Sequence, residues 1–236
     1  MFKNLTVLIA FLMMIGSQVS AFDPDNVERL RDTKQCAQCD LDGAYLQGAT
    51  LRGANLEGAN LAKANLDYAH LQGATLRGAN LEGAYLEGAN LQGANLKRAN
   101  LEAAYLRDVN LEGSNLNAAN LVNANLESAN LNMANLKGAK LRGAYLEGAN
   151  LYMVKLEGAF LYGANLEGAD LYGANLEAAD LGSAELQGAN LVNAILRGVN
   201  LEAADLRGAN LEGARMKGAI LCNTIMPDGS VIYSGC

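Results

Sequence analysis

The stretch Ala54-Asn55-Leu56-Glu57-Gly58 recurs, with small changes, through most of this chain. From Leu41 to Leu221 every fifth residue is Leu, with Met216 as the exception, which makes 37 consecutive five-residue repeats. If the Leu position is called i, position i-2 is Ala in 32 repeats, position i-1 is most often Asn, and position i+2 holds 22 of the 26 glycines. A repeat this regular decides the fold before any other feature does.

A five-residue period fits neither an α-helix nor a flat strand. An α-helix turns about 100° per residue, so successive leucines would scatter around its surface instead of forming an apolar stripe. In a flat strand side chains alternate, so successive leucines would point to opposite faces. The chain must therefore turn once per repeat, with positions i-2 and i facing inward and positions i-1 and i+1 facing outward. Glycine at i+2 suits the corner, where φ is unusual or backbones lie close.

Runs such as Ala54-Asn55-Leu56-Glu57-Gly58 and Ala164-Asn165-Leu166-Glu167-Gly168 resemble the pentapeptide-repeat family, whose pattern is Ala-Asp/Asn-Leu-x-x. The resemblance covers about three quarters of the chain. It implies an all-β solenoid, a right-handed quadrilateral β-helix in which four repeats make one coil. Residues 40–222 would then form just over nine coils, a rod about 45 Å long at a strand spacing of about 4.8 Å. Its interior of stacked Leu and Ala would be too tightly filled for a ligand.

The segment 1–21 has the layout of a secretory signal peptide. Lys3 precedes an apolar run from Leu5 to Ile15, and Val19-Ser20-Ala21 suits cleavage after Ala21. The apolar run is shorter than the roughly 20 residues that cross a bilayer. Loss of Lys3 changes the formal net charge from -7 to -8, which disfavours nucleic acid as a partner. We therefore expect an exported protein with no membrane attachment after cleavage.

Short segments on both sides of the repeats are expected to close the ends of the rod. Residues 22–39 contain a predicted capping helix over Asp23–Arg31, with Asp23 at the N-cap, Pro24 at N1 and arginines late. Val27 and Leu30 would pack on the first coil. Residues 223–236 form the second cap, with two short extended runs around the turn Pro227-Asp228-Gly229.

The four cysteines flank the repeats, two on each side. In an exported protein an even count favours disulfides. Across a rod of the length implied by the family resemblance, only Cys36 with Cys39 and Cys222 with Cys236 lie close enough to pair. Alternatively, Cys36 and Cys39 form a redox motif or half of a zinc site. The end segments also resemble those of exported cyanobacterial family members of the periplasm or thylakoid lumen, which have no assigned activity as a class.

The sequence contains no recognisable constellation for catalysis, and we expect no catalytic residue, cofactor or metal. The inward positions are almost wholly Leu and Ala, so no pocket with convergent polar groups is predicted. The one histidine, His70, replaces Asn at i-1 and should project from a flank of the rod. The asparagines at i-1 are expected to be surface amides that bond from coil to coil.

With four repeats per coil, equivalent positions of successive coils share a face. At i-1, one column holds Tyr45, Tyr85, Tyr105 and Tyr145. The i+1 column beside it is mainly acidic and contains Asp67, Glu87, Glu127, Glu147 and Glu167, with Arg107 and Arg207. Two faces away, the i+1 column is mildly basic and contains Arg77, Lys97, Lys137, Arg197 and Lys217, with Glu57, Glu157 and Glu177. Tyr152 and Tyr172 share a third face.

Three classes of function remain open. The first is a non-catalytic, monomeric rod that binds or scaffolds a protein partner through the tyrosines and the neighbouring Glu87, Glu127 and Glu147, unless these side chains merely solvate the rod. The second is a DNA mimic, because some cytoplasmic family members resemble duplex DNA and protect a topoisomerase; the export signal and the interspersed bases count against it. The third is a redox protein that uses Cys36 and Cys39.

Overall fold

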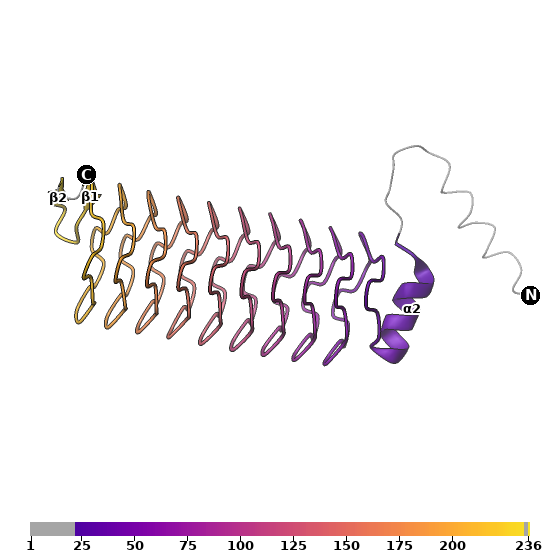
Figure 1. Cartoon of the computed structure of the whole chain (residues 1–236). Helices are drawn as coiled ribbons and strands as arrows, with labels where there is room; N and C mark the ends of the chain where they lie inside the picture. Colours follow the sequence, from indigo (N-terminus) through magenta and orange to yellow (C-terminus); the bar gives the residue numbers. More distant parts are fainter. Residues whose placement is uncertain (1–21, 234–235) are drawn as a thin grey trace, which may run out of the picture.

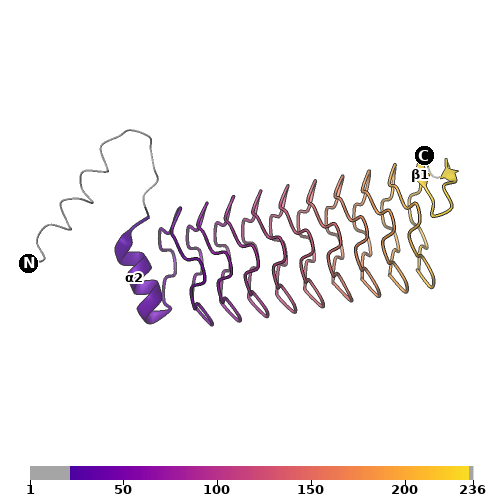
Figure 2. The ribbon, with the colours of Figure 1, turned by 180° about the vertical axis from the view of Figure 1, so that it is seen from behind.

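The computed structural model describes residues 22–233 and Cys236, so the signal peptide predicted over residues 1–21 lies outside the described residues. Helix α2 (Pro24–Thr33) precedes a long series of stacked coils, which ends in strands β1 (Thr224–Ile225) and β2 (Val231–Ile232). The coils form a rod with α2 at one end and the hairpin at the other (Figures 1 and 2). The fold is thus the solenoid that the repeat predicts.

Parallel single-residue bridges hold the coils together. They run from Gln35↔Asn55 to Asp205↔Ile225, and every one joins a residue at i-1 to the i-1 residue four repeats later. On one side Leu61 N donates to the carbonyl oxygen of Asn80 at 2.6 Å, and this bond recurs in nearly every repeat. Each coil therefore comprises four repeats, and each flat side is too short to form a longer strand. The bridged region starts at Gln35, before the predicted boundary at residue 40, and ends at Ile225, just after the predicted boundary at residue 222.

Each corner is a β-turn with a left-handed residue at i+2. Ala84 N donates to the carbonyl oxygen of Leu81 at 3.0 Å, and Gly83 between them has a φ of 60°. A turn with positive φ at its third residue favours glycine, because a Cβ crowds the backbone there. The same conformation is imposed on non-glycine residues such as Ala103 (φ 53°) and Ala118 (φ 56°).

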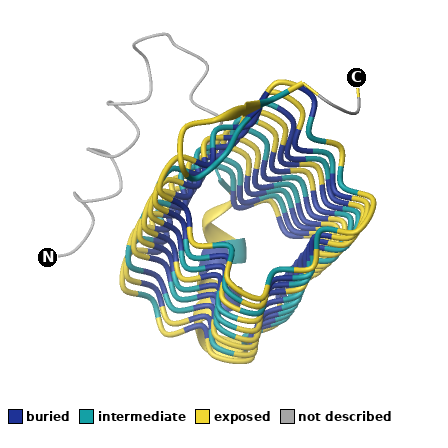
Figure 3. Ribbon diagram, turned by 90° about the vertical axis from the view of Figure 1, so that its left-hand side faces the viewer, coloured by how far each residue is buried: buried dark blue, intermediate teal, exposed yellow. Residues whose placement is uncertain are grey.

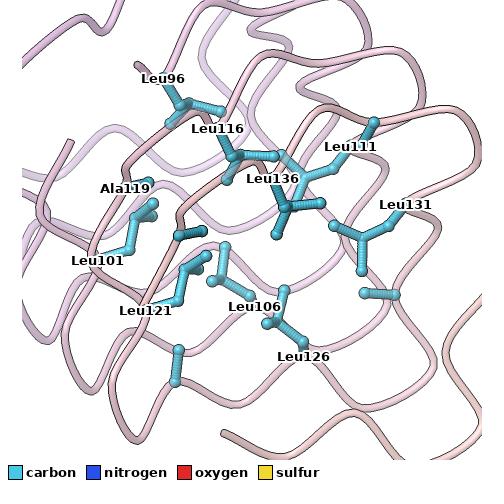
Figure 4. Packing of buried hydrophobic residues seen from close by; sticks show 14 of the residues in the cluster. Leu96, Leu101, Leu106, Leu111, Leu116, Ala119, Leu121, Leu126, Leu131 and Leu136 are labelled. Atoms are coloured by element: carbon cyan, nitrogen blue, oxygen red, sulfur yellow. The ribbon is translucent and has the colours of Figure 1, made fainter. Parts of the chain in front are cut away.

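The interior is a continuous apolar column that runs the length of the rod. Every Leu at position i from Leu41 to Leu206 is at most 1% exposed, and buried residues line the inner wall of the coils (Figure 3). Leucines in equivalent positions of successive coils lie directly above one another, as Leu96, Leu116 and Leu136 do in Figure 4. Ser114 replaces Ala at one inward position, and its hydroxyl donates to the carbonyl oxygen of Leu111 at 2.6 Å, so it is buried with a partner.

The N-terminal end is covered by α2, which begins as its sequence predicts. Asp25 N donates to Asp23 Oδ1 at 3.0 Å, Pro24 opens the helix, and Lys34 ends it in the left-handed conformation. Val27 and Leu30 are buried against the first coil. Cys36 takes the place of the inward Leu in a further repeat before Leu41, which the period of the leucines alone does not predict.

The C-terminal end is covered less completely. Strands β1 and β2 pair antiparallel, with Thr224 opposite Ile232. The inward residues of the last coil, Leu211, Met216 and Leu221, are only partly buried. Thr224 is fully buried, and its hydroxyl donates to the carbonyl oxygen of Leu201 at 2.7 Å.

Two disulfides lie at the two ends of the rod, Cys36–Cys39 and Cys222–Cys236. Their Cα atoms are 5.2 Å and 4.9 Å apart. The first joins inward positions of two successive repeats at the start of the rod, and the second ties Cys236 to the last coil. Each disulfide therefore constrains one end.

Enlarging an inward alanine should destabilise the rod. Ala124 has no exposed surface, so Ala124→Leu should overpack the interior and lower the free energy of unfolding by about 1 to 3 kcal/mol. The matched control is Ala62→Leu, the same change at a half-exposed corner, which should cost much less. Denaturant unfolding measures both, and equal losses would contradict the inward assignment of position i-2.

Substitution of alanine by glycine should change the free energy of unfolding in opposite directions at corner positions i+2 and i+1. Ala118→Gly should raise the free energy of unfolding by roughly 0.5 to 1 kcal/mol, because relief of the left-handed strain exceeds the added chain entropy. Ala62, at i+1, has no positive φ, so Ala62→Gly should lower the free energy of unfolding by roughly 0.5 to 1 kcal/mol. Thermal and denaturant unfolding measure both variants. A change of the same sign in the free energy of unfolding at both sites would contradict the left-handed conformation assigned to position i+2.

Peptide mapping of the purified protein without reduction should recover Cys36 linked to Cys39 and Cys222 linked to Cys236. Both pairs are local, and the two ends of the rod are too far apart for exchange between them. A pair that joins the two ends, or one zinc ion per chain measured at Cys36 and Cys39, would refute this assignment.

Candidate functional site

Four tyrosines lie in one exposed column on the outside of the rod. The bridges run Tyr45↔Asn65↔Tyr85↔Tyr105↔Asn125↔Tyr145, so the structure brings together the four tyrosines that the sequence spacing groups. Their exposed fractions range from 45% for Tyr85 to 74% for Tyr45. We call Tyr45, Tyr85, Tyr105 and Tyr145 the tyrosine column.

Stacking fixes the two central rings. Tyr85 and Tyr105 come from adjacent coils, and their centroids are 4.9 Å apart with the planes at 3°. Offset stacking of this kind stabilises aromatic pairs. Asn65 and Asn125 interrupt the column, so Tyr45 and Tyr145 stand apart from the central pair. A shallow depression of about 280 Å³ lies over Asn125, between Tyr105 and Tyr145.

The corner beside the tyrosine column carries a negative charge that is only partly neutralised. Arg107 Nε lies 3.5 Å from Asp108 and 4.0 Å from Glu127, so the charge of one of the two bases at this corner is paired with acids. In the part of the chain that the structure describes, neither Glu87 nor Glu147 has an ion-pair partner within 4 Å, and both are exposed. The face is therefore acidic next to its aromatic rings.

The second base of this corner is bound to an acid as well. Arg207 donates hydrogen bonds from its guanidinium to both carboxylate oxygens of Asp205, and these bonds hold the pKa of Asp205 below its usual value. Asp205 also accepts a hydrogen bond from Gln187 Nε2 at 2.9 Å. Neither Arg107 nor Arg207 is thus a free positive charge on this face.

On the mildly basic face two of the bases pair with acids one coil away. Arg77 Nε lies 3.5 Å from Glu57, and Lys137 Nζ lies 2.9 Å from Glu157. The Arg77–Glu57 pair is exposed and contributes little to stability, whereas Glu157 of the second pair is half-buried. The effect of the two pairs is to leave the basic face with a weaker field than its residue count suggests.

The asparagines at i-1 have two roles, of which the sequence reasoning identified one. As expected, a ladder of side-chain amides joins successive coils from Asn60 to Asn120 through hydrogen bonds of 2.9 to 3.1 Å. In addition, Asn Oδ1 commonly accepts from the backbone N–H two residues later, as Asn125 does from Glu127 at 3.0 Å. This local bond supports the corner turn, which is why Asn also occurs where no amide lies above or below it.

The structure shows a second apolar patch at the surface, of which the sequence analysis grouped only the two tyrosines. Tyr152 and Tyr172 stack with their centroids 5.3 Å apart. Met133 and Met153 are exposed at the next position of the same corner, and their separation by one full coil was the available signal. Phe160 and Tyr162 are also exposed, but on other sides of the rod.

The structure places the remaining candidate residues without assembling a reaction centre around them. His70 is exposed on a flank, between Thr50 and Asn90. Within residues 22–233 and Cys236, no group of three or more His, Cys, Asp or Glu side chains could hold a metal ion. Over the same residues, no helix is both long and apolar enough to span a bilayer.

Coils of four five-residue repeats, an interior of Leu and Ala, and polar and aromatic side chains on the surface define a β-helical solenoid. The pentapeptide-repeat family model matches residues 39–182 and 184–222. The chain therefore belongs to the pentapeptide-repeat family, whose fold is a right-handed β-helix.

The chain is also similar to several proteins of solved structure. HetL, a pentapeptide repeat protein involved in heterocyst differentiation regulation in the cyanobacterium Nostoc sp. strain PCC 7120, is 37% identical, with 90% of this chain and all of HetL aligned at a TM-score of 0.52. Trypsin-treated QnrB1, a plasmid-mediated fluoroquinolone resistance protein, is 18% identical, with 77% of this chain and 86% of QnrB1 aligned at a TM-score of 0.50, a likeness of fold alone. A protein from the Arabidopsis thaliana thylakoid lumen is 30% identical over 52% of this chain and 72% of its own, with a TM-score of 0.26. No curated protein matches the chain.

Proposed function

We propose that this protein is an exported, non-catalytic rod that binds a protein partner through the tyrosine column. The observation that carries the proposal is the alignment of four exposed tyrosines in one column beside Glu87 and Glu147, which have no ion-pair partner within 4 Å among the described residues. The predicted signal peptide supports a location in the periplasm or the thylakoid lumen, and the protein acts there as a monomer.

The physical properties of the face suit binding. A tyrosine offers a large contact area with a hydroxyl for orientation, and it loses little side-chain freedom when it is bound. The rings stand on coils that are bonded to both neighbours, so the backbone needs no ordering on association. Glu87 and Glu147 would steer a basic partner toward the column.

A non-catalytic role is supported by where the polar groups lie. The interior from Leu41 to Leu206 consists almost wholly of buried Leu and Ala, so it offers no cavity in which reacting groups could converge. The likeness to HetL, which is involved in regulation, is compatible with action through contacts with other molecules.

The two alternative functions have less support. A redox role needs an accessible thiol, whereas Cys36 is fully buried and Cys39 is 5% exposed. A mimic of DNA needs a strongly negative rod, whereas bases such as Arg77 and Lys137 are interspersed with the acids.

Replacing the stacked pair of the tyrosine column should abolish partner binding. The double variant Tyr85→Ser and Tyr105→Ser removes two contact surfaces and should lose the proteins that co-purify with the mature rod from the exported fraction. Only a small loss of stability is expected, because both rings are exposed. Pull-down with mass spectrometry and thermal unfolding measure the two effects.

The matched control is the double variant Tyr152→Ser and Tyr172→Ser, which removes the other stacked pair from a different corner. It should lose a similar amount of stability and keep the partner. If the Tyr85 and Tyr105 variant loses stability while its partners are unchanged, the column is structural and the proposal fails.

A further inference from the structure

The tyrosine column contains two gaps of equal size, and each gap is bounded by two rings. Asn65 lies between Tyr45 and Tyr85, and Asn125 lies between Tyr105 and Tyr145. At both places a short amide replaces a ring. The depression over Asn125, lined by Tyr105, Tyr145, Asn123 and Ala103, is the space that the missing ring leaves.

Each gap has room for one planar group. Tyr105 and Tyr145 are two coils apart, about 9.6 Å at a strand spacing of about 4.8 Å. One plane midway would lie about 4.8 Å from each ring, which matches the 4.9 Å of the Tyr85 and Tyr105 stack. Two planes would be separated by only about 3.2 Å, less than the contact distance of about 3.5 to 4 Å.

The acidic side chains near the gaps favour a planar group that carries a positive charge. Glu87 and Glu147 lie two residues after Tyr85 and Tyr145, on coils that bound the two gaps; both carboxylates are exposed, and within the described residues neither has an ion-pair partner within 4 Å. Two bases are also near: Arg107 pairs with Asp108 and Glu127, and Lys63 lies at the other end of the flat side that carries Asn65. An arginine guanidinium is planar and positively charged, and it stacks on aromatic faces while its N–H groups bond to carboxylates. A cation within about 6 Å of a ring centroid is attracted by the ring, and here both rings of a gap would lie within that range.

The distance between the gaps fixes the spacing of the arginines. Asn65 and Asn125 are three coils apart, about 14.4 Å along the rod axis. In an extended peptide, residues i and i+4 point to the same side and are about 13.6 Å apart. Arginines at i and i+2 would be only about 6.8 Å apart and could not reach both gaps.

We propose that the tyrosine column binds an extended peptide segment that lies along the rod axis, with arginines at positions i and i+4 inserted into the gaps over Asn65 and Asn125. This inference rests on the proposed function, since it names the chemistry of the partner that the same face recognises. The distance between the two missing rings thus sets the distance between the two arginines.

The test is a variant that fills the gap over Asn125 with an aromatic ring. Asn125→Tyr places a ring between Tyr105 and Tyr145, so the face gains aromatic area but loses one insertion site. The matched control is Asn165→Tyr, the same change in the same column on the far side of Tyr145, where no second ring closes a gap. The probe is the peptide Ser-Thr-Arg-Ser-Thr-Ser-Arg-Thr-Ser, and its Kd is measured by fluorescence anisotropy at low and physiological ionic strength.

We expect Asn125→Tyr to weaken peptide binding by roughly tenfold, because the cation loses contact with two rings, while Asn165→Tyr leaves the Kd within about twofold of the unmodified rod, given the modest energy of a single exposed contact. A peptide with lysines in place of arginines, or with arginines two residues apart, should bind more weakly by a similar factor.

Unchanged or tighter binding by Asn125→Tyr, or equal affinity for the lysine peptide, would overturn the inference. If the Tyr85→Ser and Tyr105→Ser variant still loses the natural partner in that case, the proposed function stands without the gaps. If neither variant changes binding of the peptide or the partner, both proposals fail.

Discussion

The hydrogen bond from the N–H of each inward leucine to the carbonyl of the next coil is the interaction on which the rest of the structure depends. It recurs at about 2.7 Å in nearly every repeat and holds successive coils in register. With the register fixed, each leucine stacks on the equivalent leucine of the next coil, and the apolar column excludes water (Figure 4). The outward side chains inherit the same register, so the sequence at i-1 and i+1 becomes a set of straight columns.

This constraint explains why sequence variation along the rod is concentrated at its surface. The inward positions tolerate little beyond Leu, Ala and a few Val or Cys residues, because one coil cannot swell without displacing its neighbours. The outward positions carry no such limit. A Tyr in place of Asn at i-1 gives up the amide hydrogen bonds and sets an exposed ring at a defined height on the rod, and the tyrosine column consists of four such positions.

The two ends of the rod are capped by different elements. A β-helix that stops abruptly exposes an apolar mouth and unpaired backbone groups. At the N-terminal end an amphipathic helix supplies Val27 and Leu30, and Cys36 continues the inward column. At the C-terminal end a two-stranded hairpin covers less, and Met216 and Leu221 remain partly exposed. The second disulfide ties this hairpin to the last coil.

The sequence by itself determined the period, the inward and outward positions, the helix that starts after Asp23 and the grouping of Tyr45, Tyr85, Tyr105 and Tyr145. The period, the inward and outward positions and the helix depend on local geometry and on a repeat that is nearly free of exceptions, so they can be read without coordinates. The grouping of the tyrosines also needs the coil of four repeats that the resemblance to the pentapeptide-repeat family implies. The sequence did not show that Cys36 fills a leucine position, since only the residue type breaks the pattern there. It also did not show which charges remain unpaired beside the rings, because Arg107 and Asp108 meet through side-chain conformation. The tertiary structure decided those points, and it also decided the spacing of the rings on both sides of Asn65 and Asn125, because stacked coils hold the rings at fixed heights.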